Sequence, residues 1–275
     1  MNYRHAFHAG NHTELFKHAV LVFLLEHLLA KPKPFMVLDS HAGLGMYDLD
    51  APEAIRTGEK AEGIERVYPD GLAVCPLYGQ IRAVNEEGPL RRYPGSPEII
   101  RRLLRPGDRL IATELHPQDH AALAARFRGL PGVIVQQRNG YEAVNALVPP
   151  RERRGLVFID PPFERKDETE IALRTLAKAL RKWATGMFCL WYPIKDNAIG
   201  DRIATFAREA GWPKAMRLEC RPFRQDGVRL CGSGMLLCNT PWTLPAKAEA
   251  LMAELCRRLG DGDGSWTLES LAASG

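Results

Sequence analysis

Short, unbroken runs of hydrophobic residues recur along this chain, and stretches with helical spacing separate most of them. Five runs have the length and composition of buried strands: Phe35–Leu38, Leu110–Ala112, Val133–Val135, Leu156–Ile159 and Met187–Tyr192. Three amphipathic stretches separate the last four runs: Gln118–Phe127, Glu142–Leu147 and Glu168–Trp183. Apolar strands that alternate with helices are typical of a parallel sheet covered on both faces. The pattern therefore predicts an α/β fold with a mostly parallel sheet.

The two ends of the chain depart from this alternation. Asn11 can cap a helix, with Glu14 three residues on, and the apolar periodicity that follows predicts a helix to about Leu29. Near the other end, Ala215–Cys220 and Met235–Cys238 have only turn-rich sequence between them. We expect these two runs to form an antiparallel pair at the sheet edge.

The interval between the first two strands is unusually long. In dinucleotide-binding folds, the carboxylate that binds the ribose lies about 20 residues beyond the first Gly-rich turn. Here the first strand ends at Asp39, and the next acidic strand end is Glu114. Because long irregular loops are rare in compact domains, we predict an inserted helical subdomain over residues 48–94. Residues 1–47 and 95–260 then form the main domain. Residues 261–275 form a C-terminal tail, which starts with a flexible break at Asp261-Gly262-Asp263-Gly264.

The composition is that of a soluble globular protein, with 45% hydrophobic residues, 25% charged residues and a net charge of +4. The six cysteines are scattered without a Cys-x-x-Cys pair, which indicates reduced thiols in a cytosolic protein. The sequence shows no secretory signal and no apolar segment long enough to span a bilayer. We therefore expect a cytoplasmic protein with no membrane partner. No seam for a dimer is visible, so we expect a monomer.

Basic side chains cluster more than this mild net charge suggests. The clusters are Arg91-Arg92, Arg101-Arg102-Arg105, Arg151-Arg153-Arg154 and Arg165-Lys166. The last two flank Asp160 in the sequence, so a phosphate backbone near that residue would explain them. Solvated surface charge explains each cluster equally well.

The segment Asp160-Pro161-Pro162-Phe163 carries the most specific chemistry in the chain. It follows a buried strand, and in open α/β sheets ligands bind at that carboxyl edge. The Asp160 carboxylate and the Pro161 carbonyl can each accept a hydrogen bond from an exocyclic amino group. The prolines make the loop rigid, and Phe163 offers a stacking surface. These residues suit a flat, nitrogen-bearing ring.

Polar groups also follow three other strands of the predicted sheet. Gly43 and Gly45 lie in a turn after Asp39, which also contains His41. Glu114 ends the second strand, where a carboxylate can bind both ribose hydroxyls. The Asn139-Gly140 pair follows the third strand and can meet the edge of an adenine. Together these strand ends predict one extended nucleoside ligand with a second substrate at Asp160.

These motifs resemble S-adenosylmethionine-dependent methyltransferases that act on nucleobase amino groups. Within that class, the chain resembles the bacterial 23S ribosomal RNA adenine-N6 methyltransferases of family J, from residue 1 to about residue 240. The segments that carry the resemblance are Tyr3-Arg4-His5-Ala6-Phe7-His8-Ala9-Gly10-Asn11-His12, Lys17-His18, Leu38-Asp39-Ser40-His41-Ala42-Gly43, Tyr93-Pro94-Gly95-Ser96-Pro97, Glu114-Leu115-His116-Pro117 and Asp160-Pro161-Pro162-Phe163-Glu164.

The resemblance implies a Rossmann-like methyltransferase sheet with a small helical insertion. It also implies S-adenosylmethionine as the cofactor and 23S ribosomal RNA, protein-free or in early assembly, as the partner. Asp160 would be catalytic, and Tyr3 would contact the RNA, with Pro161 and Phe163 against the base. The cofactor would contact His18, His41, Gly43, Ser96, Glu114, Asn139 and Gly140.

Two positions depart from the family pattern. Phe163 replaces the usual tyrosine, which keeps stacking but removes a hydroxyl contact. Asn139 replaces the usual aspartate, and we expect its amide oxygen still to accept from the adenine amino group. Ser96-Pro97-Glu98 also has the pattern of a helix cap.

Other functions remain open at this stage. The same loop serves DNA adenine-N6 and cytosine-N4 methyltransferases, and an RNA-binding module with an inactive cofactor site is a non-enzymatic alternative. Methylation of a release-factor glutamine is less favoured, because that chemistry usually shows Asn-Pro-Pro-Tyr. The histidines near the N-terminus have no Cys or carboxylate cluster to complete a ligand set, so no metal site is expected.

Overall fold

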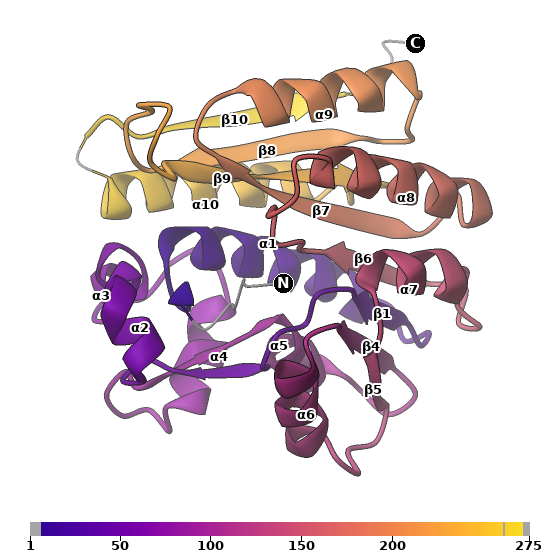
Figure 1. The fold of residues 1–275 in the computed structure, drawn as a ribbon, viewed down its shortest axis with the longest axis horizontal. Helices are drawn as coiled ribbons and strands as arrows, with labels where there is room; N and C mark the ends of the chain where they lie inside the picture. The colour runs from indigo at the N-terminus through magenta and orange to yellow at the C-terminus, as the bar shows by residue number, and fades with distance from the viewer. Residues whose placement is uncertain (1–6, 261, 272–275) are drawn as a thin grey trace.

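An eight-stranded sheet forms the centre of the computed structural model, which describes residues 7–260 and 262–271 (Figure 1). The strand order is β10-β8-β9-β7-β6-β1-β4-β5. The strands are β1 (Met36–Asp39), β4 (Arg109–Glu114), β5 (Val133–Gln137), β6 (Gly155–Ile159), β7 (Met187–Ile194), β8 (Met216–Arg221), β9 (Gly232–Cys238) and β10 (Ser265–Ser270). Pairing is parallel from β5 through β7 and antiparallel from β7 through β10. The predicted α/β fold is confirmed.

Helices cover both faces of the sheet, because successive side chains of each strand point to opposite sides. Val37, Leu156 and Phe158 belong to one hydrophobic core, and Leu38 and Val157 belong to the other. The first core includes residues of α1 (His12–Leu29), α5 (Ser96–Leu103), α6 (Pro117–Arg126) and α10 (Leu244–Leu259). The second includes residues of α7 (Gly140–Leu147), α8 (Glu168–Lys182) and α9 (Ala198–Glu209).

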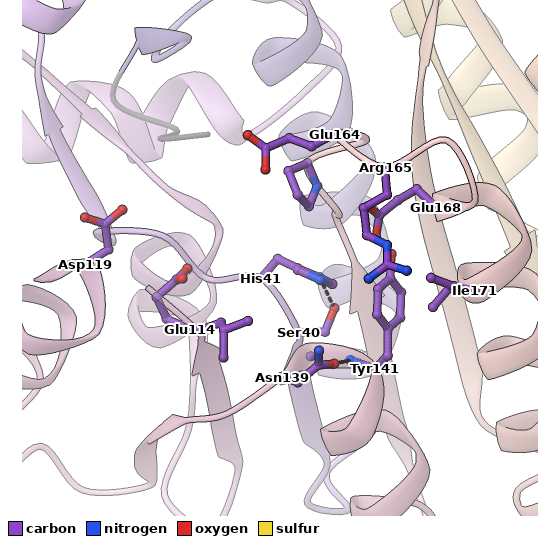
Figure 2. Close-up of a pocket in the computed structure, with 13 residues that line it drawn as sticks. Ser40, His41, Glu114, Asp119, Asn139, Tyr141, Glu164, Arg165, Glu168 and Ile171 are labelled. Atoms are coloured by element: carbon purple, nitrogen blue, oxygen red, sulfur yellow. Dashed lines mark hydrogen bonds between the residues drawn. The ribbon is translucent and has the colours of Figure 1, made fainter. Parts of the chain in front are cut away.

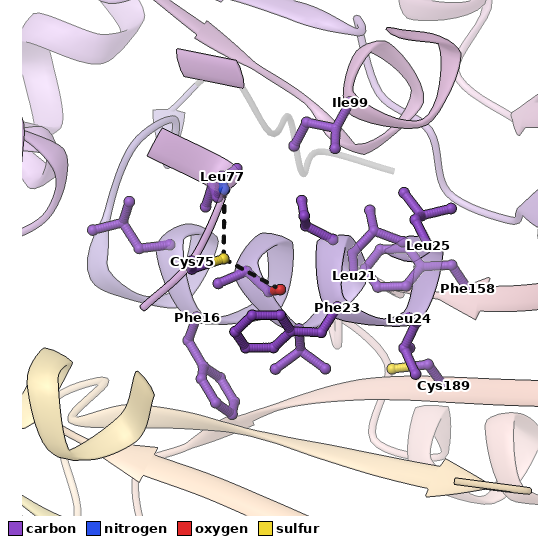
Figure 3. Packing of buried hydrophobic residues seen from close by; sticks show 14 of the residues in the cluster. Phe16, Leu21, Phe23, Leu24, Leu25, Cys75, Leu77, Ile99, Phe158 and Cys189 are labelled. Atoms are coloured by element: carbon purple, nitrogen blue, oxygen red, sulfur yellow. Dashed lines mark hydrogen bonds between the residues drawn. The ribbon is translucent and has the colours of Figure 1, made fainter. Parts of the chain in front are cut away.

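Helix α1 lies inside the first core rather than on its surface (Figure 3). It carries apolar residues on all sides, as expected for a helix that is buried all round. The Asn11 side chain accepts from the Glu14 backbone N–H at 2.9 Å, so the predicted cap is confirmed. The Glu14 carboxylate instead contacts Lys17 inside the protein. Among the described helices, none is long and apolar enough to cross a membrane.

The segment predicted as an insertion leaves and re-enters the main domain through a short antiparallel pair, β2 (Met46–Asp48) and β3 (Arg92–Pro94). Between them lie α2 (Pro52–Thr57), η2 (Glu59–Glu62), α3 (Ile64–Val67) and α4 (Leu77–Val84). Arg66 donates to the Leu259 carbonyl, and Arg258 donates to the Gly71 carbonyl, so the segment is attached to α10. The division into two subdomains stays a prediction.

The C-terminal part of the sheet differs from the expectation. The β8–β9 pair is antiparallel as predicted, but it does not form the edge, because β10 pairs with β8 outside it. Residues 265–270 of the expected tail are therefore part of the sheet. The β10 segment alternates Trp266 and Leu268 with polar residues, which is the pattern of a half-exposed edge strand.

The strand order reverses beside β1, which pairs with β4 on one side and with β6 on the other. In open α/β sheets, ligands bind outside the carboxyl ends of the strands at such a switch point. The carboxyl ends of β1, β4, β5 and β6 lie along one edge because these strands are parallel. The residues that follow them are those singled out in the sequence.

Helix α1 provides a direct test of the first core. Leu24 is 1% exposed, whereas Ile55 on α2 is 62% exposed. We expect Leu24→Ala to lower the free energy of unfolding by about 3 kcal/mol, because it leaves a cavity in packed surroundings. The matched Ile55→Ala variant should change it by at most about 0.5 kcal/mol. Urea unfolding followed by circular dichroism measures both, and equal midpoints would contradict the placement of α1.

Candidate active site

Asp160 follows β6 directly and is 2% exposed. Its Oδ2 accepts a hydrogen bond from Lys17 Nζ at 2.5 Å, which forms a buried ion pair between the sheet edge and α1. Its Oδ1 is also buried and has no hydrogen-bond partner among the described residues. An unpaired buried acceptor is costly. This oxygen is therefore ready to accept from a bound donor.

Lys17 lies between two buried carboxylates, because it also contacts Glu14. Its Nζ lies 5.2 Å from the centre of the Trp191 ring. Burial raises the pKa of Glu14, and the Lys17 charge opposes that rise. The sequence analysis assigned no role to Glu14 or Lys17 at the site. The available signal was a pair of opposite charges within an otherwise apolar helix, where charged residues need partners.

The loop after Asp160 is rigid and locally strained. Pro161 is buried, Pro162 is half-buried, and no described donor contacts the Pro161 carbonyl. Phe163 has φ of 51°, in the left-handed region that non-glycine residues adopt at a cost of about 1 kcal/mol. Its half-buried ring packs edge-on against Trp191, with centroids 5.8 Å apart. The surrounding packing therefore holds the Phe163 ring in a defined orientation.

A cavity of about 400 Å³ lies along the carboxyl ends of the parallel strands (Figure 2). Its volume is within the usual range for small-molecule and cofactor sites. Residues after β1, β4, β5 and β6 line it together: Ser40, His41, Glu114, Leu115, Asp119, Asn139, Gly140, Tyr141, Pro162, Glu164, Arg165, Glu168 and Ile171. The predicted His41, Glu114, Asn139 and Gly140 are therefore brought together in one cavity.

His41 lies at the middle of this cavity (Figure 2). Its Nδ1 is 2.8 Å from Ser40 Oγ, and its ring packs edge-on against Tyr141 at 5.2 Å. Burial lowers the pKa of His41 to about 4, so the imidazole is neutral at pH 7. The Tyr141 hydroxyl donates to Glu168 Oε1 at 2.6 Å. This contact joins α7 to α8 at one end of the cavity.

Glu114 connects the β1 turn with the β4 end. Its carboxylate accepts from the Gly43 backbone N–H at 2.9 Å and from the His116 backbone N–H at 2.7 Å. Burial raises the pKa of Glu114, while these hydrogen bonds favour the ionised form. Gly43 thus contacts Glu114 through its backbone and is not part of the cavity lining. Asp119 also lines the cavity and was missed in the sequence, because it lies inside the predicted helix.

The Asn139-Gly140 pair begins α7. The Asn139 Oδ1 accepts from the backbone N–H groups of Tyr141 and Glu142, so it caps the helix. That this oxygen accepts from an adenine stays a prediction. A side chain at Gly140 would place its Cβ 2.1 Å from the Ser40 carbonyl oxygen. Only glycine allows the start of α7 to lie this close to the β1 turn.

A second, water-sized cavity of about 10 Å³ lies next to Asp160 and is also lined by His41. Lys17, His18 and Ser96 contribute to its walls. The His18 Nδ1 is 3.0 Å from the Tyr93 hydroxyl, which positions its ring. Ser96 is not the helix cap that its sequence pattern suggested: Gly95 is the N-cap of α5, and no side chain caps it. The buried Ser96 hydroxyl is thus not needed to begin the helix.

Asp39 is 0% exposed, and neither carboxylate oxygen has a hydrogen-bond partner among the described residues. Burial raises its pKa to about 7, and the nearby Asp160 adds to this rise. The Ser96 hydroxyl lies close enough to favour the ionised form, but it makes no hydrogen bond to either oxygen. A buried carboxylate without a partner fits a cationic ligand group in this region. Asp39 was predicted from the sequence to end the first strand and to belong to a segment that resembles the family, but not to contact a ligand.

The arginine clusters separate into two groups in the structure. Arg154 donates to the carbonyls of Leu28 and Lys33, and Arg109 binds Glu152. Arg154 directly precedes β6, at the amino end of that strand, whereas Asp160 follows its carboxyl end. The expectation that this cluster lies near Asp160 is therefore wrong. The Arg165-Lys166 pair does lie beside the Asp160 loop. Tyr3, expected to contact RNA, lies outside the described residues.

Trp183, Trp191 and Trp212 are buried, so they are core residues and not exposed surfaces on which a base could stack. Over residues 7–260 and 262–271, no group of three or more His, Cys, Asp or Glu side chains is placed to hold a metal ion.

Comparison with known proteins shows the family to which this chain is similar. Residues 32–272 match the family model described as "Ribosomal RNA large subunit methyltransferase D, RlmJ". The chain is 39% identical to "Ribosomal RNA large subunit methyltransferase J" of Haemophilus influenzae, over 98% of each chain. It is 38% identical to the protein of that name from Escherichia coli, over 94% of each chain. The Rossmann-like methyltransferase fold implied by the resemblance is confirmed.

A solved structure shows the same arrangement of the backbone. The crystal structure of protein LPL1258 from Legionella pneumophila is 34% identical and superimposes with a TM-score of 0.88. The match covers 97% of this chain and 99% of that one. The inserted segment and the C-terminal strands therefore fall within the shared structure.

The Lys17–Asp160 ion pair can be tested by a double-mutant cycle. Lys17→Met keeps the apolar stem but leaves two carboxylates buried without their cation, so we expect a loss of about 3 kcal/mol in the free energy of unfolding. Adding Asp160→Asn should restore part of this loss, because the two residues interact directly. Chemical denaturation measures all four proteins, with the exposed Lys178→Met as the control. Additive losses would contradict a direct interaction.

The raised pKa of Asp39 predicts a pH-dependent stability. An aspartate in the unfolded chain ionises near pH 3.9, whereas Asp39 in the folded protein ionises at about pH 7. Asp39 therefore lowers the free energy of unfolding progressively as the pH rises from about 4 to 7, by at most about 4 kcal/mol. Asp39→Asn should match the wild type in stability near pH 4 and exceed it near pH 7. Thermal unfolding across this range, with the exposed Asp263→Asn as control, checks the difference, and parallel pH profiles would refute it.

Proposed function

We propose, from the premise that this chain belongs to the RlmJ family of ribosomal RNA large subunit methyltransferases, that it methylates the exocyclic N6 of an adenine in 23S ribosomal RNA. The enzyme is a methyltransferase, and ribosomal RNA is the substrate class of its family. The observation that carries the finer assignment is the buried, unpartnered Oδ1 of Asp160 beside the cavity at the sheet edge. The proposal includes a cytoplasmic enzyme, because its substrate is ribosomal RNA, and a monomer, because the sequence shows no seam for a dimer.

The residues of both cavities fit S-adenosylmethionine. Glu114 and His41 would hold the nucleoside part, with Asn139 and Gly140 at its base. Asp39 would compensate the positive charge of the amino-acid part, since its buried carboxylate lacks a partner. His18 and Ser96 would lie beside that part, in the wall of the smaller cavity. When bound, this cofactor supplies an electrophilic methyl group on a sulfonium.

Asp160 orients the adenine amino group. The nitrogen of that group is a poor nucleophile, because its lone pair is delocalised into the ring. The Asp160 Oδ1 and the Pro161 carbonyl are free to accept one N–H each, which localises the lone pair on the nitrogen. Holding the amine in one orientation lowers the barrier by several kcal/mol in general. Asp160 can also receive the proton that the amine loses.

Lys17 determines which oxygen of Asp160 accepts the hydrogen bond from the adenine amino group. By binding Oδ2, it fixes the carboxylate plane and leaves Oδ1 as the acceptor. Its charge also pairs with the Asp160 carboxylate inside the protein, where a lone charge would be costly. The Phe163 ring would stack on the adenine once that base leaves its helix or loop. Its packing against Trp191 fixes the angle of the ring.

A methyl-transfer assay tests both the catalytic residue and the substrate. Asp160→Asn should lower kcat by roughly 10³-fold, because the amide cannot take a proton, while the Kd for S-adenosylmethionine changes by less than about threefold. Labelled methyl donor with protein-free 23S ribosomal RNA measures the rate, and calorimetry measures cofactor binding. Glu249→Gln, an exposed carboxylate on α10 that lines neither cavity, is the control and should retain most activity.

The same assay separates the alternatives. Near-normal activity of Asp160→Asn would refute the proposed role of that residue. Transfer to duplex DNA but not to ribosomal RNA would indicate a DNA methyltransferase. The absence of any cofactor binding would favour an RNA-binding module.

A further inference from the structure

A second opening, of about 400 Å³, lies beside Phe163 and is shared between the Asp160 loop and the segment that follows β7. Basic side chains dominate its lining: Arg165, Lys166, Lys195 and Arg202, against the single carboxylate of Asp196. We call this opening the basic groove. Arg165 also lines the cavity that contains His41. The groove and that cavity are therefore neighbours, separated by the Asp160 loop.

The lysines carry the unneutralised charge of the basic groove. Arg165 pairs with Asp167 at 2.9 Å, and Arg202 pairs with Glu170. Lys166 and Lys195 are exposed and make no ion pair with any residue the structure describes. Because exposed ion pairs are weak and screened by salt, the two guanidinium groups can also exchange their partners for another anion.

The remaining features of the groove also favour an anion. The Asp196 Oδ1 accepts from the Ala198 backbone N–H at 2.9 Å, so this carboxylate is held at the start of α9 and not against either lysine. Ala198 and Ile199 of the first turn of α9 line the groove. The amino end of a helix carries a partial positive charge, which adds to that of the lysines.

We propose that the basic groove binds the phosphodiester backbone of the RNA strand next to the target adenosine. This inference rests on the proposed function, because the Phe163 ring at the inner side of the groove is the surface against which the adenine would stack. A nucleotide held there must continue into its neighbours, and their phosphates need cations nearby. The groove supplies those cations on the side of the Asp160 loop that faces away from the cavity around His41.

The phosphate contacts position the strand and do not read its sequence. Flexible lysine side chains provide charge without the fixed geometry that base recognition requires. The groove therefore contributes affinity and orientation, while Asp160 and Pro161 select the amino group. If the groove binds only phosphates, RNA affinity should depend on the charge of Lys166 and Lys195 and not on the shape of their side chains.

RNA binding as a function of salt tests this. The double variant Lys166→Gln/Lys195→Gln should bind a protein-free 23S ribosomal RNA transcript roughly tenfold more weakly than the wild type. The slope of log Kd against log salt should become shallower by about 1.4, since each single-strand phosphate contact contributes about 0.7. The charge-preserving variant Lys166→Arg/Lys195→Arg should stay within about threefold of the wild type. Lys178→Gln, an exposed lysine on α8, is the control for a general loss of charge.

Two results would overturn the proposal. One is an RNA affinity and salt slope of the glutamine pair that match those of Lys178→Gln. The other is an equal loss in the arginine pair, which would indicate shape in place of charge. Calorimetry with S-adenosylmethionine and the melting temperature should be unchanged in every variant, which excludes a folding defect. Failure of the proposed function has a different result, namely RNA binding that depends on these lysines without methyl transfer by the wild type.

Discussion

The ion pair between Lys17 and Asp160 joins the two parts of the chain on which the site depends. Asp160 ends a central strand, and Lys17 belongs to a helix that is buried on all sides. Because neither charge can remain unpaired in the interior, the pair specifies how α1 lies against the sheet. The pair also makes the two oxygens of the Asp160 carboxylate different. Oδ2 accepts from Lys17, and Oδ1 has no hydrogen-bond partner among the described residues, which is why we propose it as the acceptor for a substrate.

The charges around this pair are arranged in two zones. Inside the sheet edge, Glu14, Asp39 and Glu114 are buried carboxylates whose pKa values are raised by burial. A cationic ligand such as a sulfonium with an ammonium group compensates such charges. Outside the Asp160 loop, Lys166 and Lys195 face an open groove and suit a polyanion. In the proposed function, the loop lies between a site for a cationic cofactor and a site for phosphates, and the methyl group is transferred from one side to the other.

The departures from the family pattern have local explanations in the structure. Phe163 packs against Trp191 in a strained backbone conformation, so its ring is positioned by packing and needs no hydroxyl contact. Asn139 caps α7 with its amide oxygen, a role that aspartate fills equally well. Phe163 and Asn139 therefore keep the packing and the helix cap that their positions provide, and we expect only their contacts with a bound ligand to differ from the family pattern.

The sequence by itself determined the parallel strands, the helices between them and the polar residues that follow these strands. Apolar runs and turn residues are local signals, and parallel strands necessarily place Glu114, Asn139 and Asp160 at one edge. Only the tertiary structure decided which charges meet. Lys17 and Asp160 are far apart in the chain, and the Arg154 cluster, although close to Asp160 in sequence, lies at the opposite end of β6. It also decided that β10, expected as a tail, closes the sheet. Pairing between distant segments depends on packing in three dimensions, which hydrophobic periodicity does not encode.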